Sequence, residues 1–124
     1  MVLTVPFDEE AYRDVLKSIG CKRAVCCLER VGAMPGQGVN SMFNFGMNYG
    51  FIRGLLEANE IPYQVVRPQD WKKEFGVTKD KNTSIEVCKR LFPQVSLLAT
   101  ERSRKENDGL AEAILMACYA KRRL

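Results

Sequence analysis

The first thirty residues carry a strand-like pattern, a helical pattern and a second strand-like pattern of hydrophobic positions. Val2–Val5 is rich in β-branched residues, which predicts a short strand. Apolar side chains then recur at helical spacing over residues 11–19; Asp8 can cap this helix and Gly20 can end it. Ala24–Leu28 is a continuous apolar run between charged residues, typical of a strand buried on both faces.

A turn-rich loop precedes the longest helical pattern of the chain. The loop, Gly32–Gly38, contains three glycines and a proline. Asn40 or Ser41 can cap the helix that follows and that continues to about Asn59. On its core side we expect five apolar residues, namely Phe43, Met47, Phe51, Leu55 and Leu56.

One more strand and two shorter helices follow. Tyr63–Arg67 has strand character, and Pro68 suits the first turn of a short helix that carries Trp71. Thr83 is the expected cap of the next helix, which ends at Phe92 before a proline.

The last third of the chain contains a long loop and a closing helix. Residues 93–107 have few structural signals, and a loop of that length is often functional. Asn107 or Asp108 opens the final helix, which runs to about Lys121. The resulting order, β-α-β-α-β-α-α-α, indicates an α/β fold with parallel strands joined by helices. At 124 residues we expect a single domain over residues 1–124.

Composition places the chain among ordinary globular proteins. Hydrophobic residues make up 46% and charged residues 27%, which argues against disorder. The longest apolar stretch, Ala113–Ala120, is too short to span a bilayer. The amino terminus carries acids where a signal peptide would be basic, so we expect neither secretion nor a membrane anchor, and a cytoplasmic location.

Cysteine and histidine usage excludes several kinds of chemistry. The chain has five cysteines, no C-x-x-C pair and no histidine. A zinc site is therefore not expected, and Ser-His-Asp or Cys-His nucleophiles are excluded. We expect the cysteines to be reduced, small apolar residues. Catalysis would have to use carboxylates, lysines, hydroxyls or a metal ion.

Positive charge gathers in the second half of the chain. The net charge is +4; residues 1–60 carry six basic and seven acidic side chains, and residues 61–124 carry thirteen and eight. This asymmetry permits a polyanionic partner such as nucleic acid, although each basic group alone is also typical of a solvated face. The groups are Lys72 with Lys73, Lys79 with Lys81, Arg102 with Arg104 and Lys105, and the residues 121–123, which we expect at a helix C-terminus.

Three acids are candidates for a metal site. Glu29 directly follows a predicted buried strand, and the carboxyl ends of parallel strands are where α/β folds place their sites. Asp108 and Glu112 are four residues apart and share one face of the last helix. Oxygen ligands of this kind suit Mg²⁺ or Mn²⁺, which supports phosphodiester hydrolysis. The structural alternatives are a strand exit for Glu29, a helix cap for Asp108 and a salt bridge for Glu112.

The Gly32–Gly38 loop does not have the Walker pattern, because no Lys-Ser/Thr pair follows its last glycine. Its glycines allow the backbone to approach a ligand, and Met34 is an apolar candidate for contact with unstacked bases. A plain connecting loop is the alternative.

Several segments, in order along almost the whole chain, resemble the phage-type branch of RuvC-like Holliday-junction resolvases. The most specific is Glu-x-x-Gly-Ala-Met-Pro-Gly-Gln-Gly, at residues 29–38. The others are residues 41–46, Tyr49-Gly50, residues 67–72, Lys79-Asp80-Lys81, Arg90-Leu91-Phe92-Pro93 and residues 108–113.

The resemblance implies a ribonuclease-H-like three-layer fold with helices on both faces of a reduced sheet. It implies a homodimer that cuts four-way DNA junctions in recombination, repair or phage DNA processing, with Mg²⁺ or Mn²⁺ and no small-molecule cofactor. Glu29, Asp108 and Glu112 match the family's catalytic metal ligands, although aspartate is common at the last position.

The resemblance also assigns residues to DNA and to the dimer. Lys72 and either Lys79 or Lys81 match lysines that face phosphate, and Met34 and Gln37 belong to the loop that meets the junction centre. We extend the DNA-binding set to the neighbouring basic residues, Lys73, Arg102, Arg104 and Lys105. Gly46 and Gly50 lie on the helix that matches one near the dimer interface, and their spacing favours close packing of another element.

The match begins at the family's third strand, so the family's first-strand aspartate has no counterpart in this sequence. We therefore expect an N-terminally truncated, reduced sheet in which Val2–Val5 pairs with Ala24–Leu28 or with another chain. Two alternatives to an active nuclease follow: a junction-binding or structural module without catalysis, or a longer native protein.

Overall fold

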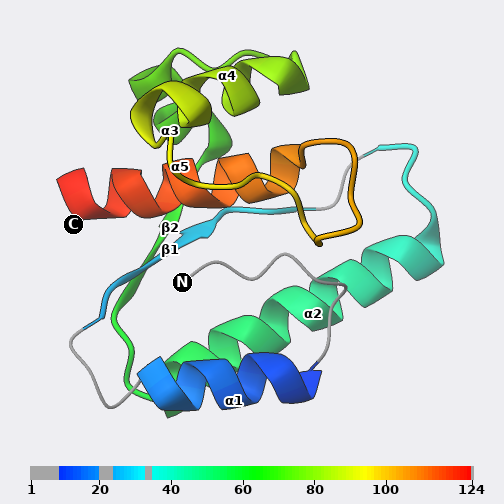
Figure 1. The fold of residues 1–124 in the computed structure, drawn as a ribbon. Coiled ribbons are helices and arrows are strands. Elements are labelled where there is room, and N and C mark those ends of the chain that lie inside the picture. The colour runs from blue at the N-terminus through cyan, green and yellow to red at the C-terminus, as the bar shows by residue number, and fades with distance from the viewer. Residues whose placement is uncertain (1–8, 20–23, 33–34, 124) are drawn as a thin grey trace. The chain divides into compact units, whose positions relative to one another are not determined.

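A computed structural model describes residues 9–19, 24–32 and 35–123 of the chain (Figure 1). The chain is mixed α/β, and β1 and β2 form a two-stranded parallel sheet. Its elements in order are α1 (Glu9–Ile19), β1 (Cys26–Glu29), α2 (Val39–Ala58), β2 (Tyr63–Val66), α3 (Pro68–Phe75), α4 (Lys81–Leu91) and α5 (Asp108–Arg123). This order matches the predicted one from the first helix onward. The predicted strand Val2–Val5 and the cap Asp8 lie outside the described residues.

The chain divides into two compact units, which we call the N-terminal unit (residues 6–65) and the C-terminal unit (residues 66–124). Each is described by itself. The coarse α/β class agrees with the prediction, whereas the ribonuclease-H-like arrangement of the layers stays a prediction. In the part of the chain that the structure describes, no helix has the length and apolar character needed to cross a membrane.

In the N-terminal unit, α1 packs against α2, and α2 leads into the short sheet. β1 begins two residues later than predicted and includes Glu29. Its four residues are half-buried, so the prediction of a strand buried on both faces is wrong. Among the described residues β1 has one neighbouring strand, so one of its edges has no strand partner and part of its surface stays accessible.

The start of α2 also differs from the prediction. Gly38, with an extended backbone, is the residue before the helix, and its carbonyl accepts the first helical bond from the amide of Met42 at 2.9 Å. Asn40 and Ser41, the predicted caps, therefore lie inside the first turn, and no side chain caps the helix. Glycine is also a favourable residue at the N-cap position, so Gly38 takes this position and the helix begins earlier than Asn40 and Ser41 predicted.

Two of the five expected core residues of α2 are exposed. Leu56 is buried with 1% of its surface accessible, but Phe43 and Met47 are 67% and 52% exposed. A Cβ atom built at Gly46 or Gly50 would meet nothing within 4 Å, so among the described residues nothing packs closely against these glycines, in contrast to the prediction. The helical spacing of apolar residues predicted an apolar face of α2, but spacing alone does not predict which element packs against that face.

The C-terminal end of α2 is closed by a backbone motif. The amide of Glu60 donates to Glu57 O at 3.1 Å and the amide of Ile61 donates to Leu56 O at 2.9 Å. These two bonds define a Schellman motif, and the buried pair Ile61 and Leu56 supplies its usual hydrophobic contact. Glu60 occupies the left-handed position of the motif at φ 54°, where glycine is the usual residue.

In the C-terminal unit, α3 and α4 both pack against α5, which runs along them in Figure 1. The core of this unit is built around Trp71, Cys88, Ala111 and Leu115, each with no measurable exposure. As predicted, Pro68 occupies the first turn of α3. Gly76 ends that helix at φ 67°.

The cap of α4 is Asp80 and not the predicted Thr83. The Asp80 carboxylate accepts from the amide of Asn82 at 3.0 Å, so the helix begins at Lys81. The Thr83 hydroxyl instead donates to the carbonyl of Asp80 at 2.6 Å and accepts from the amide of Thr78 at 3.1 Å. Asp and Thr are both favourable N-cap residues, and here Asp80, the earlier of the two, caps the start of α4.

Candidate metal and nucleic-acid site

The two acids of the last helix lie at its start, as predicted. Asp108 is the first residue of α5, and Glu112 follows one turn later, so both side chains leave the same face. Asp108 keeps 39% of its side chain exposed and Glu112 is half-buried. A carboxylate pair of this kind is accessible to a cation from solvent.

Asn107, one of the two residues predicted to open the last helix, is the cap of α5. Its side-chain oxygen accepts from the amide of Leu110 at 2.9 Å, which caps the helix. Its backbone amide donates to the carbonyl of Leu97 at 2.8 Å. The same residue therefore caps the helix that carries Asp108 and closes the loop before it.

The predicted long loop is present: residues 92–107 contain no helix or strand. Its base is anchored because Leu97 is only 2% exposed and bonds to Asn107. Within the loop, the hydroxyls of Thr100 and Ser103 lie 2.8 Å apart, and the Lys89 ammonium donates to Glu106 at 3.1 Å. The loop presents three exposed cations beside the start of α5, which are Arg102, Arg104 and Lys105.

Lys81, one of the predicted DNA-binding residues, forms an ion pair with a predicted metal ligand. Its Nζ atom lies 3.9 Å from Oδ2 of Asp108, and its side chain is 79% exposed. The packing of α4 against α5 brings these two helix N-termini together. Lys79, two residues earlier, is exposed in the turn before α4.

Lys72 and Lys73 lie on α3, in the same unit. Lys72 is half-buried, with its ammonium 5.7 Å from the centre of the Trp71 ring, and Lys73 is exposed. Arg67 donates to both carboxylate oxygens of Asp70 at 3.0 Å and lowers the pKa of that carboxyl group. This pair spans the first turn of α3.

Basic residues at the C-terminus have a structural partner that the sequence did not reveal. Glu74 of α3 accepts two hydrogen bonds from Arg123 and lies 3.7 Å from Arg122. The Arg122 guanidinium also lies over the Phe75 ring at 5.1 Å. We predicted an interaction of this group with the dipole of its helix; the structure adds an acidic partner on α3.

The other predicted site residues belong to the N-terminal unit. Glu29 is the last residue of β1 and is half-buried. Gly36 follows Pro35 in a turn at φ 83°, the geometry that a type II turn requires of its third residue, and Gln37 after it is exposed. Met34 lies outside the described residues.

The donor set can be compared with what a metal ion needs. In the described ranges, 9–19, 24–32 and 35–123, no three or more His, Cys, Asp or Glu residues form a cluster suited to a metal. Asp108 and Glu112 supply two carboxylates on one helix face. Mg²⁺ is commonly held by one or two carboxylates while it keeps several waters, so this pair fits such an ion. The contribution of Glu29 stays a prediction.

Three of the described cysteines, Cys26, Cys27 and Cys88, are poorly suited to nucleophilic or metal chemistry. Cys26, Cys27, Cys88 and Cys118 are free thiols. Burial raises the pKa of Cys26 and Cys88, and burial together with neighbouring Cys26 and Glu29 raises the pKa of Cys27 to about 11. A protonated thiol is a weak nucleophile and a poor metal ligand, which agrees with the predicted apolar role.

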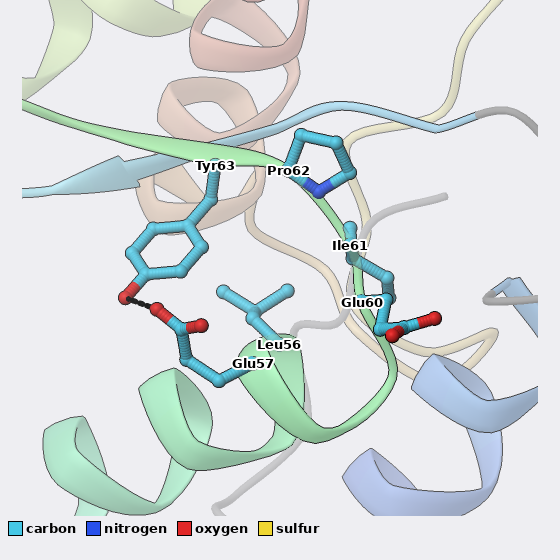
Figure 2. A pocket seen from close by; sticks show the side chains of 6 residues that line it. All are labelled: Leu56, Glu57, Glu60, Ile61, Pro62 and Tyr63. Carbon is cyan, nitrogen blue, oxygen red and sulfur yellow. Dashed lines mark hydrogen bonds between the residues drawn. The ribbon is translucent and has the colours of Figure 1, made fainter.

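An open pocket of about 460 Å³ lies where α2 meets β2, and sequence reasoning missed it (Figure 2). In Figure 2 the Tyr63 hydroxyl donates to Oε1 of Glu57, a bond of 2.9 Å. The Arg53 guanidinium, which the figure does not draw, donates to the same hydroxyl at 3.5 Å. Leu56, Glu60, Ile61 and Pro62 complete the lining. The lining includes Glu60, whose left-handed backbone at the end of α2 no sequence pattern indicated.

No protein-family model matches the chain, and no curated protein matches its sequence.

Proposed function

We propose that the protein is a metal-dependent, structure-specific endonuclease that cuts four-way DNA junctions in recombination, repair or phage DNA processing. The observation that carries the proposal is the acid pair Asp108 and Glu112 at the start of α5. The loop of residues 92–107 directly before it presents exposed basic side chains. The resemblance of residues 29–38 to the junction-resolving family supplies the substrate class.

In this proposal Asp108 and Glu112 hold Mg²⁺ or Mn²⁺, and Glu29 is a further ligand by the resemblance alone. The bound ion supplies an activated water and neutralises charge on the phosphate and on the leaving oxygen. The protein's own contribution is to hold the carboxylates in place: the Asn107 cap fixes the first turn of α5, so Asp108 and Glu112 stay one helical turn apart.

The basic residues of the C-terminal unit bind the phosphate backbone. Residues 61–124 carry thirteen basic and eight acidic side chains, and the exposed cations lie on α3, on the turn before α4 and on the loop before α5. These contacts hold the DNA in register and neutralise its charge. The residues are Lys72, Lys73, Lys79, Lys81, Arg102, Arg104 and Lys105.

The N-terminal unit serves the junction centre and the dimer. Met34 and Gln37 contact unstacked bases at the branch point. The exposed apolar residues of α2 support a homodimer through this helix, because exposed apolar side chains that gather on one element often mark a protein interface. They are Val39, Phe43, Phe45 and Met47, and Gly46 and Gly50 leave room beside them for a close approach.

The test is incubation of the purified protein with a labelled four-way junction and a matched linear duplex, in Mg²⁺, Mn²⁺ or EDTA. We expect paired nicks in the junction that need the metal and disappear in Asp108→Asn. Glu86→Gln, which neutralises an exposed acid on α4, is the charge-matched control and should keep activity. Binding of the junction without cleavage in any metal would instead identify a binding module, and absence of both would refute the proposal.

A further inference from the structure

Lys81 has an unusual position for a basic residue. It is the first residue of α4, and its ammonium lies 3.9 Å from Asp108, the first residue of α5. The partial positive charge of a helix is at its N-terminus, so an ammonium beside two such ends is disfavoured by both helix dipoles. Asp80 already caps α4, so the helix end itself does not require Lys81.

The attraction that holds the ammonium in this place is therefore the carboxylate charge, in particular that of Asp108. The contact is long and the Lys81 side chain is 79% exposed, so the pair contributes little to stability. A long flexible lysine can leave such a contact without disturbing the fold. A divalent cation that binds Asp108 and Glu112 would compete for the same oxygen.

We propose that Lys81 is a displaceable counter-ion of Asp108: it neutralises this carboxylate while no metal is bound, and metal binding releases its ammonium toward a DNA phosphate. This inference rests on the proposed metal site. It makes Lys81 a positioning residue that couples metal binding to DNA binding. Removal of the lysine charge should therefore strengthen metal binding, although it weakens DNA binding.

The chain offers a matched control on the same helix. Lys89 also forms an ion pair, with Glu106 at 3.1 Å, but it lies in the last turn of α4, where a cation is favoured by the helix dipole. Lys89→Gln changes the net charge by the same amount as Lys81→Gln. Lys89→Gln leaves the ion pair between Lys81 and Asp108 intact, so it should not change the competition between Lys81 and a metal ion for Asp108.

The experiment is calorimetric titration of Mn²⁺ into the wild type and into Lys81→Gln, Lys81→Arg, Lys89→Gln and Asp108→Asn, without DNA. Loss of a competing exposed ion pair should tighten Mn²⁺ binding by about two- to fivefold in Lys81→Gln. We expect wild-type affinity in Lys81→Arg and Lys89→Gln, and loss of binding in Asp108→Asn.

The outcomes separate this inference from the proposed function. If the wild type binds Mn²⁺ through Asp108 but Lys81→Gln has the affinity of Lys89→Gln or a weaker one, the counter-ion role is wrong and the metal site stands. If neither the wild type nor Lys81→Gln binds Mn²⁺, the metal site is wrong and the counter-ion role is wrong with it.

Discussion

Replacement of Glu60 by glycine should stabilise the protein. Glu60 has φ 54° at the left-handed position of the Schellman motif that ends α2. An L-residue in that conformation costs about 1–2 kcal/mol, whereas glycine adopts it without a Cβ clash. Glycine also loses about 0.5–1 kcal/mol more backbone entropy on folding, so the net gain is about 0.5–1 kcal/mol.

For a chain of 124 residues this gain corresponds to a rise in melting temperature of about 2–5 °C. Differential scanning calorimetry of wild type, Glu60→Gly and Glu60→Ala measures it. The alanine variant removes the same carboxylate from the pocket edge but keeps the Cβ atom, so it should not be stabilised. A glycine variant that melts at or below the alanine variant would refute the argument from backbone strain.

Two further predictions concern charge and protonation. Lys72→Gln should reduce the slope of log affinity against log salt for a four-way junction by about one, because one phosphate contact is lost; Lys121→Gln is the control, and an unchanged slope in Lys72→Gln would contradict the assignment. The Cys27 thiol, with its pKa raised from 9.0 to about 11, should be alkylated slowly at pH 8, with a rate that rises about tenfold per pH unit up to pH 11. The neutral thiol is favoured in the folded state, so its contribution to stability is complete below pH 9 and is lost as pH rises from 9 to 11; mass mapping of alkylated Cys27 that shows fast reaction at pH 8 would contradict the burial argument.

The sequence predicted element types better than element ends. The predicted start of α5 included the observed cap, Asn107, whose side-chain oxygen accepts from a helix amide. Asparagine is a common N-cap residue, so this local interaction can be predicted from the residue type. The start of α4 was wrong because Asp80 and Thr83 are both good caps, and the choice depends on the turn from Thr78. The left-handed Glu60 had no signal at all, since glutamate rarely adopts that conformation.

Tertiary contacts were the least predictable part. Phe43 and Met47 have the spacing of core residues, but spacing specifies a face and not its partner, and both are exposed. For the candidate site, the adjacency of Asp108 and Glu112 follows from helical geometry alone. The contact between Lys81 and Asp108 spans 27 positions and depends on the packing of α4 against α5, which no local pattern encodes.

The two hydrogen bonds of Asn107 allow the loop of residues 98–106 to vary independently of α5. Its backbone amide bonds to Leu97 and its side chain bonds to Leu110, so residues 98–106 begin and end at one fixed point. Insertions or deletions between these ends cost little closure entropy and leave the register of α5 unchanged. Such a loop can change in length and charge while Asp108 and Glu112 keep their places. Under the proposed function, changes in this loop would alter the contacts with DNA without moving the two proposed metal ligands.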